Sequence, residues 1–155
     1  MIKVGVLGAG SMGAGIAQVA AQSGHKVVLC DTKQEQLDLA KSKLAKIMAR
    51  LVEKEKITID QSNATQGNIS YSTSMNDFAG SGMVIEAIIE NIDIKKSVFS
   101  NLESIVDEDC ILASNTSSLS IASIAAACKK ADRVIGIHFF NPAPLMPLVE
   151  IIPAV

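Results

Sequence analysis

The fold is decided by the stretch Ile2-Lys3-Val4-Gly5-Val6-Leu7-Gly8-Ala9-Gly10-Ser11-Met12-Gly13. Its apolar run up to Leu7 predicts a buried strand, and apolar residues that recur at helical spacing as far as Gly24 predict a helix. Between them, Gly8, Gly10 and Gly13 have the spacing of the dinucleotide-binding fingerprint. The first glycine permits a tight turn, the second lets the backbone approach a pyrophosphate, and the third packs the helix on the strand.

A carboxylate follows the second predicted strand, residues 26–30. Asp31 lies 18 residues beyond Gly13, where it can accept hydrogen bonds from the ribose hydroxyls of the adenosine half. Its negative charge should repel the additional phosphate of NADP, so NAD is the expected cofactor. Because Lys33 lies close by, NADP stays an alternative. A glycine-rich turn with Asp31 as a helix cap is the competing interpretation, and the strand-helix-strand frame disfavours it.

The rest of the chain alternates strands with helices. A long amphipathic helix is expected over residues 34–56 and a polar loop over 58–67. The further expected elements are strands at 68–73, 83–88, 110–113, 133–137 and 148–152 and helices near 94–106 and 120–128. Right-handed crossovers between such strands give a doubly wound sheet. The predicted fold class is α/β, a Rossmann-type, mostly parallel sheet with helices on both faces.

Composition narrows the setting of this domain. With 155 residues, the chain forms one ordinary domain, and a net charge of −2 gives no reason to expect a nucleic-acid partner. The uncharged residues 4–24 are interrupted by glycines, so neither a membrane span nor a signal peptide is predicted. Three scattered cysteines indicate buried thiols in a reducing cytoplasm, and no metal-ligand spacing occurs.

Polar residues follow several strands at the edge where parallel sheets keep their chemistry. His138, one of two histidines, closes the strand at 133–137, although a strand-end histidine is more often structural. Residues 114–119 contribute a run of hydroxyls and an amide, of which capping by Ser118 or Ser120 explains only one. For Glu86 and Glu90, a solvated loop position is at least as probable as a role in the site.

A basic stripe lies on the long helix and comprises Lys43, Lys46, Arg50 and Lys54. The default interpretation is a solvated face, and the alternative is a surface that holds the phosphates of a large anionic substrate.

Five ordered segments together resemble the 3-hydroxyacyl-CoA dehydrogenase family, closest to the bacterial 3-hydroxybutyryl-CoA dehydrogenases. These segments are GAGSMG at 8–13, EAIIEN at 86–91, SNTSSL at 114–119, HFFNP at 138–142 and LVEII at 148–152. The resemblance implies a catalytic pair, His138 and Glu150, and a substrate-contacting Ser117. It implies cofactor contacts at Gly8, Ala9, Gly10, Ser11, Met12, Gly13, Asp31, Glu90, Lys95, Ser117 and Asn141.

The resemblance also implies coenzyme A contacts on the long helix. Alignment at AKSK, residues 40–43, places a family lysine on Lys56, whereas a family serine meets Ala49. Arg50 of the basic stripe is a second candidate.

The implied reaction is the NAD-linked, reversible oxidation of the 3-hydroxyl of a short-chain 3-hydroxyacyl-CoA. Family members continue into an all-helical domain through which they form homo-oligomers, so we expect residues 1–155 to be the NAD-binding part of a longer enzyme and to be inactive alone. The open alternatives are an NAD-binding module without turnover and a dehydrogenase of the 3-hydroxyisobutyrate type.

Overall fold

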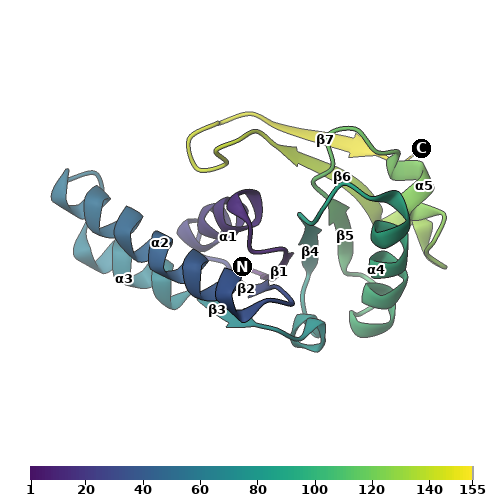
Figure 1. Cartoon of the computed structure of the whole chain (residues 1–155), viewed down its shortest axis with the longest axis horizontal. Coiled ribbons are helices and arrows are strands. Elements are labelled where there is room, and N and C mark those ends of the chain that lie inside the picture. Colours follow the sequence, from purple (N-terminus) through teal and green to yellow (C-terminus); the bar gives the residue numbers. More distant parts are fainter. Residues whose placement is uncertain (155) are drawn as a thin grey trace.

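A seven-stranded sheet forms the centre of the molecule (Figure 1). The structure, a computed structural model, describes residues 1–154, so Val155 lies outside the described residues. The strands are β1 (Lys3–Leu7), β2 (Lys26–Cys30), β3 (Ile69–Ser72), β4 (Met83–Glu86), β5 (Ile111–Ser114), β6 (Val134–Phe139) and β7 (Val149–Pro153). They lie in the order β3-β2-β1-β4-β5-β6-β7. Every neighbouring pair is parallel except β6 and β7, which confirms the mostly parallel sheet.

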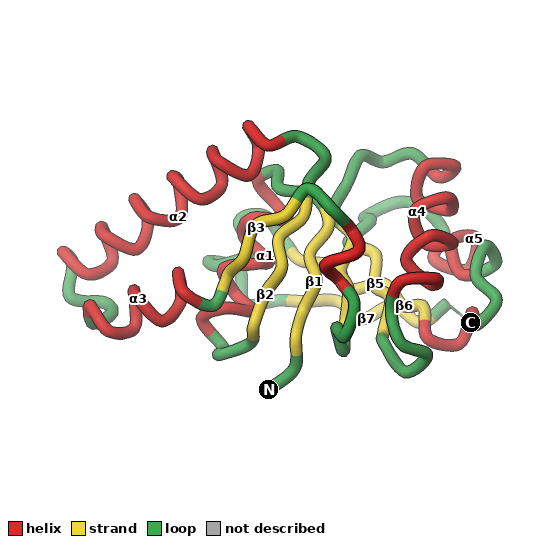
Figure 2. Tube along the Cα trace, turned by 90° about the horizontal axis from the view of Figure 1, so that it is seen from below, coloured by secondary structure: helices red, strands yellow, loops and turns green. Residues whose placement is uncertain are grey.

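Helices cover both faces of this sheet (Figure 2). The α-helices are α1 (Ser11–Gln22), α2 (Gln34–Glu53), α3 (Ile59–Gly67), α4 (Ile92–Ile105) and α5 (Ile121–Ala125), with short 3₁₀ turns η1 (Met75–Phe78) and η2 (Ala131–Arg133). Buried side chains of α1 and α2 pack against one face of the sheet, and those of α4 and α5 pack against the other. The doubly wound α/β architecture predicted from the sequence is therefore confirmed.

The apolar strands reflect burial on both faces. In β2, Val27 and Leu29 enter the core beneath α1 and α2, whereas Val28 and Cys30 enter the core beneath α4 and α5. Such strands read as continuous apolar runs rather than alternating ones. All three cysteines are buried, as expected, and burial raises the pKa of the Cys30 thiol to about 11.

The order of the strands reverses between β1 and β4. The chain first builds outward from β1 to β2 and β3, and then returns to place β4 on the other side of β1. At such a switch point the loops that leave the two strands diverge, and ligands of open α/β sheets bind there.

One predicted loop is a helix. Residues 58–67 were expected to loop out because they are polar, but Ile59–Gly67 forms α3. Its start is a capping box in which the Thr58 hydroxyl accepts a hydrogen bond from the Gln61 backbone and the Gln61 side chain accepts one from the Thr58 backbone. The Thr-x-x-Gln spacing carries this signal in the sequence. Ser62 and Thr65 are the buried side chains of α3, so its inward face is small and polar rather than apolar.

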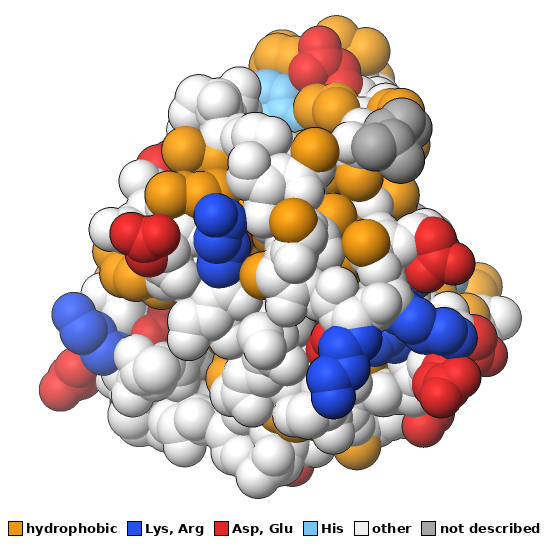
Figure 3. All heavy atoms as spheres, turned by 90° about the vertical axis from the view of Figure 1, so that its right-hand side faces the viewer, with side chains coloured by type: hydrophobic (Ala, Val, Ile, Leu, Met, Phe, Trp, Pro, Cys, Tyr) orange, Lys and Arg blue, Asp and Glu red, His pale blue; other side chains and the backbone are white. Residues whose placement is uncertain are grey.

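The edge strand β7 and the loop before it carry exposed apolar side chains. Ile151 of β7 is 63% exposed, and Leu145 and Leu148 of the preceding loop are 78% and 57% exposed. Figure 3 shows hydrophobic side chains beside a histidine and carboxylates at the top of one face, the level at which Figure 1 places β6 and β7. Among the described residues, no helix is both long enough and apolar enough to cross a membrane.

Candidate functional site

The glycine loop joins β1 to α1 at the switch point. Gly8 has a φ of +106°, a backbone conformation that residues with a side chain rarely adopt. A Cβ atom on Gly13 would lie 1.7 Å from the Gly8 carbonyl oxygen, so only glycine allows α1 to approach the loop so closely. A Cβ atom on Gly10 would meet no atom within 4 Å, which leaves open space beside the backbone. The three positions have the properties that the fingerprint predicts.

The N-terminus of α1 is suited to an anion. Gly10 caps the helix without any side-chain hydrogen bond, and no acidic residue occupies the first turn. The backbone N–H groups at such an end, together with the helix dipole, favour a phosphate group. Ser11 and Met12 lie in this first turn.

Asp31 lies beside the glycine loop at the end of β2. One carboxylate oxygen accepts a hydrogen bond from the Ala9 backbone N–H at 2.9 Å, and the other accepts one from the Lys33 backbone N–H at the same distance. Each oxygen retains a further lone pair that a ribose hydroxyl can use. Asp31 therefore fits the adenosine end of a dinucleotide whose pyrophosphate lies at Gly10.

A cavity of about 370 Å³ opens at the carboxyl ends of β4, β5 and β6. Six residues predicted for the site line it, namely Met12, Glu90, Lys95, Ser117, His138 and Asn141. Because Met12 belongs to the first turn of α1, the cavity adjoins the phosphate end of the glycine loop. The tertiary structure thus brings together segments that are separated by more than 100 residues in the sequence.

His138 faces Glu150 across the antiparallel strands β6 and β7. The two residues are directly opposite in the register, and Nδ1 of His138 lies 3.1 Å from Oε2 of Glu150. The Phe140 ring lies against the imidazole, with the ring centroids 4.7 Å apart. An ionised carboxylate only accepts hydrogen bonds, so this contact fixes the proton on Nδ1 and leaves Nε2 free to exchange a proton.

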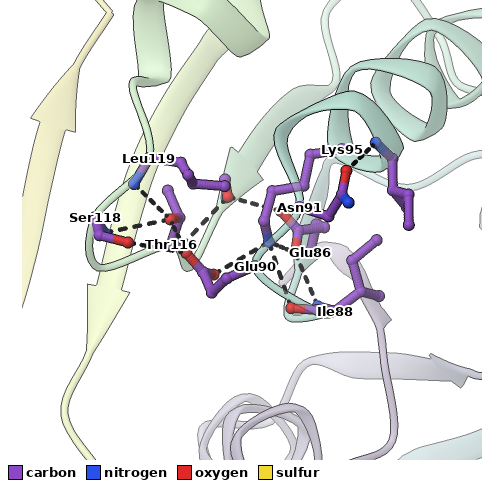
Figure 4. A network of polar contacts seen from close by, with 10 residues as sticks. Glu86, Ile88, Glu90, Asn91, Lys95, Thr116, Ser118 and Leu119 are labelled. Carbon is purple, nitrogen blue, oxygen red and sulfur yellow. Dashed lines mark hydrogen bonds and ion pairs between the residues drawn. The ribbon is translucent and has the colours of Figure 1, made fainter.

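A buried ion pair lies behind the cavity. Glu86 and Lys95 are both 0% exposed, and Nζ of Lys95 lies 2.5 Å from Oε2 of Glu86. Glu86 also accepts hydrogen bonds from the Ser114 hydroxyl and the Ile88 backbone N–H. Figure 4 shows Lys95 reaching both Glu86 and Glu90, and the second distance is 3.4 Å. A solvated position, one of the two interpretations of Glu86, is therefore wrong, because β4 ends inside the molecule.

Glu90 connects this ion pair to the loop after β5. It accepts hydrogen bonds from the hydroxyls of Thr116 and Ser118 (Figure 4). Partial burial opposes ionisation of Glu90, but these hydrogen bonds and the charge of Lys95 outweigh that effect and hold its pKa below the ordinary value. Glu90 thus remains an anion that orders the loop carrying Ser117.

Two residues with clear roles in this geometry escaped the sequence predictions. Glu86 neutralises Lys95, and Asn115 lines the cavity while its side chain binds the backbone of Phe139 at 2.8 Å. Asn115 belongs to the polar run 114–119, so the sequence indicated this segment as part of the site but did not predict the contact with Phe139. Within the described part of the chain, no group of three His, Cys, Asp or Glu side chains is arranged to hold a metal ion.

The residues predicted to contact coenzyme A lie apart from this cavity. Arg50 and Lys56 are exposed at the far end of α2 and in the turn after it, and neither lines the 370 Å³ cavity. A second cavity of about 400 Å³ lies between α1, α2 and the loop at Pro142 and Leu145. Lys43 of the basic stripe lines it together with apolar side chains of α2.

Residues 3–155 match the family model described as the NAD binding domain of 3-hydroxyacyl-CoA dehydrogenase. A probable 3-hydroxybutyryl-CoA dehydrogenase of Deinococcus radiodurans is 50% identical over 97% of this chain. The chain spans 54% of that relative, about half of its length.

Solved structures agree with this match. The structure superimposes on (S)-3-hydroxybutyryl-CoA dehydrogenase of Ralstonia eutropha with a TM-score of 0.92 at 44% identity, covering 96% of this chain and 53% of that one. For 3-hydroxybutyryl-CoA dehydrogenase of Escherichia coli the TM-score is 0.95 at 41% identity, covering 96% and 32% of the two chains. The glycine loop, the helix end and Asp31 fit NAD, the cofactor of this domain family. The chain belongs to the 3-hydroxyacyl-CoA dehydrogenase family and comprises its NAD-binding domain.

Proposed function

We propose that this domain carries the proton-transfer pair for the NAD-dependent, reversible oxidation of the 3-hydroxyl of a short-chain 3-hydroxyacyl-CoA. The observation that carries the proposal is the contact of 3.1 Å between His138 and Glu150 beside a cavity that adjoins the glycine loop. An imidazole held by a carboxylate is a suitable general base near neutral pH. Its position at the dinucleotide site supports a redox reaction at a carbon that carries a hydroxyl group.

His138 takes the proton of the substrate hydroxyl through Nε2 and returns it in the reverse direction. Glu150 holds Nδ1–H, which orients the ring and stabilises the imidazolium as it forms. NAD, when bound, supplies the hydride acceptor. Ser117 is exposed at the rim of the same cavity and donates a hydrogen bond to the substrate oxygen.

The remaining cofactor contacts follow from the cavity walls. Met12, Asn141 and Lys95 line the cavity, and Met12 belongs to the first turn of α1 beside the glycine loop. Because the Lys95 ammonium is paired with Glu86 and Glu90, its contribution to NAD binding is to fix Glu90 and the nearby backbone. Met12 and Asn141 would contact and orient the bound dinucleotide.

The substrate proposal rests on the relatives and on the second cavity. The named relatives are 3-hydroxybutyryl-CoA dehydrogenases, and the apolar groove between α1 and α2 offers space for a thioester arm. Arg50 of the exposed basic stripe, together with Lys56 in the turn after α2, supplies charge for the coenzyme A phosphates.

The apolar surface at Leu145, Leu148 and Ile151 supports a further part of the proposal. We propose that the all-helical domain of the family covers this surface, completes the acyl pocket and forms the homo-oligomer. The buried thiols are consistent with work in a reducing cytoplasm.

The test is turnover of acetoacetyl-CoA with NADH by the protein in its natural full length. We expect His138→Gln to lower kcat by roughly 100-fold or more, with NADH affinity nearly unchanged. His25→Gln is the matched control because His25 contacts the backbone of Ile2, at the opposite edge of the sheet from the cavity. Full activity of His138→Gln would exclude this histidine from the mechanism.

The same assay separates the alternatives. Turnover of free hydroxy acids in place of the coenzyme A thioester would favour a 3-hydroxyisobutyrate-type reaction. NADH binding without turnover of either substrate would favour a nucleotide-binding module.

A further inference from the structure

Strand β6 extends beyond its neighbour β5. The parallel pairing between them begins at Leu112 with Val134 and ends at Ser114 with Gly136. The last three residues of β6, which include His138, continue past this point. On the other side β7 remains paired, with Glu150 opposite His138 and Val149 opposite Phe139. The segment that carries the proposed base is therefore supported by a strand on one side only.

Beyond the end of β5, the side chain of Asn115 takes over the hydrogen bonding to β6. Its side-chain oxygen accepts a hydrogen bond from the Phe139 backbone N–H at 2.8 Å, in a partly buried position. Its own backbone N–H donates to the carbonyl oxygen of Glu86 at 2.9 Å. One residue thus ties together the ends of β4, β5 and β6, and its side chain continues the hydrogen bonding of the sheet where the backbone has turned away.

We propose that Asn115 is a positioning residue for His138. By holding the N–H group of the next residue, Asn115 fixes the backbone at His138 from the β5 side, while β7 and Glu150 fix it from the other side. The orientation of the imidazole toward the cavity follows from both constraints. The inference rests on the proposed function, because it gives Asn115 a role only through proton transfer by His138.

The two hydrogen bonds of Asn115 can be separated by substitution. Asn115→Leu has a similar size but no acceptor, so it removes the bond to Phe139, whereas the bond from its backbone to Glu86 remains. Asn115→Asp retains an acceptor oxygen at the same place. A comparison of the two variants separates the effect of the hydrogen bond to the Phe139 backbone from the effect of changed packing in the loop.

The experiment uses the protein in its natural full length. Amide hydrogen exchange at Phe139 and the ring ¹⁵N signals of His138 report the geometry, and the second histidine, His25, is an internal reference. The pH profile of kcat with acetoacetyl-CoA and the affinity for NADH report the function. Asn101→Leu, at an exposed position of α4, is the matched control.

We expect Asn115→Leu to expose the Phe139 amide to faster exchange, to shift the His138 ring signals and to lower kcat roughly 10- to 100-fold. Its NADH affinity should stay within about threefold, because the glycine loop is unchanged. Asn115→Asp should recover the protection of Phe139 and most of kcat, and its added charge should move the alkaline limb of the pH profile upward, because His138 must be protonated to reduce acetoacetyl-CoA. Asn101→Leu should resemble the unsubstituted protein.

The proposal fails if Asn115→Leu keeps kcat within about twofold, or if Asn115→Asp restores the protection of Phe139 but not kcat. The proposed function would fail separately if the unsubstituted protein did not turn over acetoacetyl-CoA. In that case the ring signals still test the role of Asn115, since unchanged His138 signals in Asn115→Leu would exclude a positioning role.

Discussion

His138 and Glu150 are direct cross-strand partners, so the register of β6 and β7 sets the contact of 3.1 Å between Nδ1 and Oε2. A slip of one residue would turn one of the two side chains to the other face of the sheet. Register depends on the length and conformation of the connecting loop, residues 140–148, so we expect this loop to influence the geometry of the proposed proton-transfer pair.

Glu150→Gln should lower kcat in the oxidation of 3-hydroxybutyryl-CoA, the direction in which the imidazolium forms, by roughly 10-fold. The amide oxygen still accepts Nδ1–H, but it no longer provides the charge that stabilises the imidazolium. Glu108→Gln, at a carboxylate that is 89% exposed and paired with Lys130, is the control and should have no effect. Equal kcat values for Glu150→Gln and the unsubstituted protein would contradict the role given to Glu150.

Lys95→Met should destabilise the fold by about 3–5 kcal/mol, because it leaves the carboxylate of Glu86 buried without its cation. Urea denaturation measures this loss. The double variant Lys95→Met with Glu86→Gln should regain part of it, since the buried charge is then absent. A loss below about 1 kcal/mol in the single variant would show that the pair contributes little.

Glu90→Gln should reduce stability at neutral pH but not in acid. The pKa of Glu90 is lowered in the folded protein, so its stabilising effect is present above the unfolded value of about 4.3 and is lost as the pH falls through the folded value. The side chain is 44% exposed, so we expect a difference of at most about 1 kcal/mol. Thermal unfolding of both proteins between neutral and acidic pH should show the difference disappearing below about pH 4. A difference that grows in acid would contradict the assignment.

Asp31→Asn should weaken the preference for NADH over NADPH by roughly 10-fold. The amide keeps one of the two backbone hydrogen bonds made by Asp31, to Ala9 or to Lys33, but lacks the charge that repels a 2′-phosphate. Titrations of both dinucleotides measure the ratio of affinities. An unchanged ratio would show that discrimination arises elsewhere in the site.

The parts of the fold that the sequence predicts are those encoded by local patterns of residues. The strand that ends at Leu7 and the helix that begins at Ser11 follow from apolar periodicity and glycine spacing, which depend on residues close together in the chain. The same kind of signal existed for α3 in the capping box of Thr58 and Gln61, but polarity suggested a loop. A small polar inner face, with Ser62 and Thr65, hid the helix from a search for apolar periodicity.

The site was predicted unevenly, for a physical reason. Parallel topology predicts that the polar residues after β4, β5 and β6 meet at one edge, as Glu90, Ser117 and His138 do. Lys95 and Asn141 entered the predictions only through the resemblance to the family. The pairing of Lys95 with Glu86 was not predicted, because a glutamate at a strand end looks the same in the sequence whether it is solvated or buried. Burial depends on which helix packs over the strand, and that is decided by contacts distant in the sequence.

The sequence by itself determined the strand-turn-helix unit and the glycines that allow a pyrophosphate to approach, since these follow from local spacing. The family of the domain came from the resemblance of five ordered segments to known proteins. Only the tertiary structure decided that Asn115 continues the sheet beside His138 and that Glu86 neutralises Lys95, and only it gives the register and distance at which Glu150 faces the imidazole. Each of these contacts joins different strands or helices, and their distances depend on strand register and the point at which a strand ends.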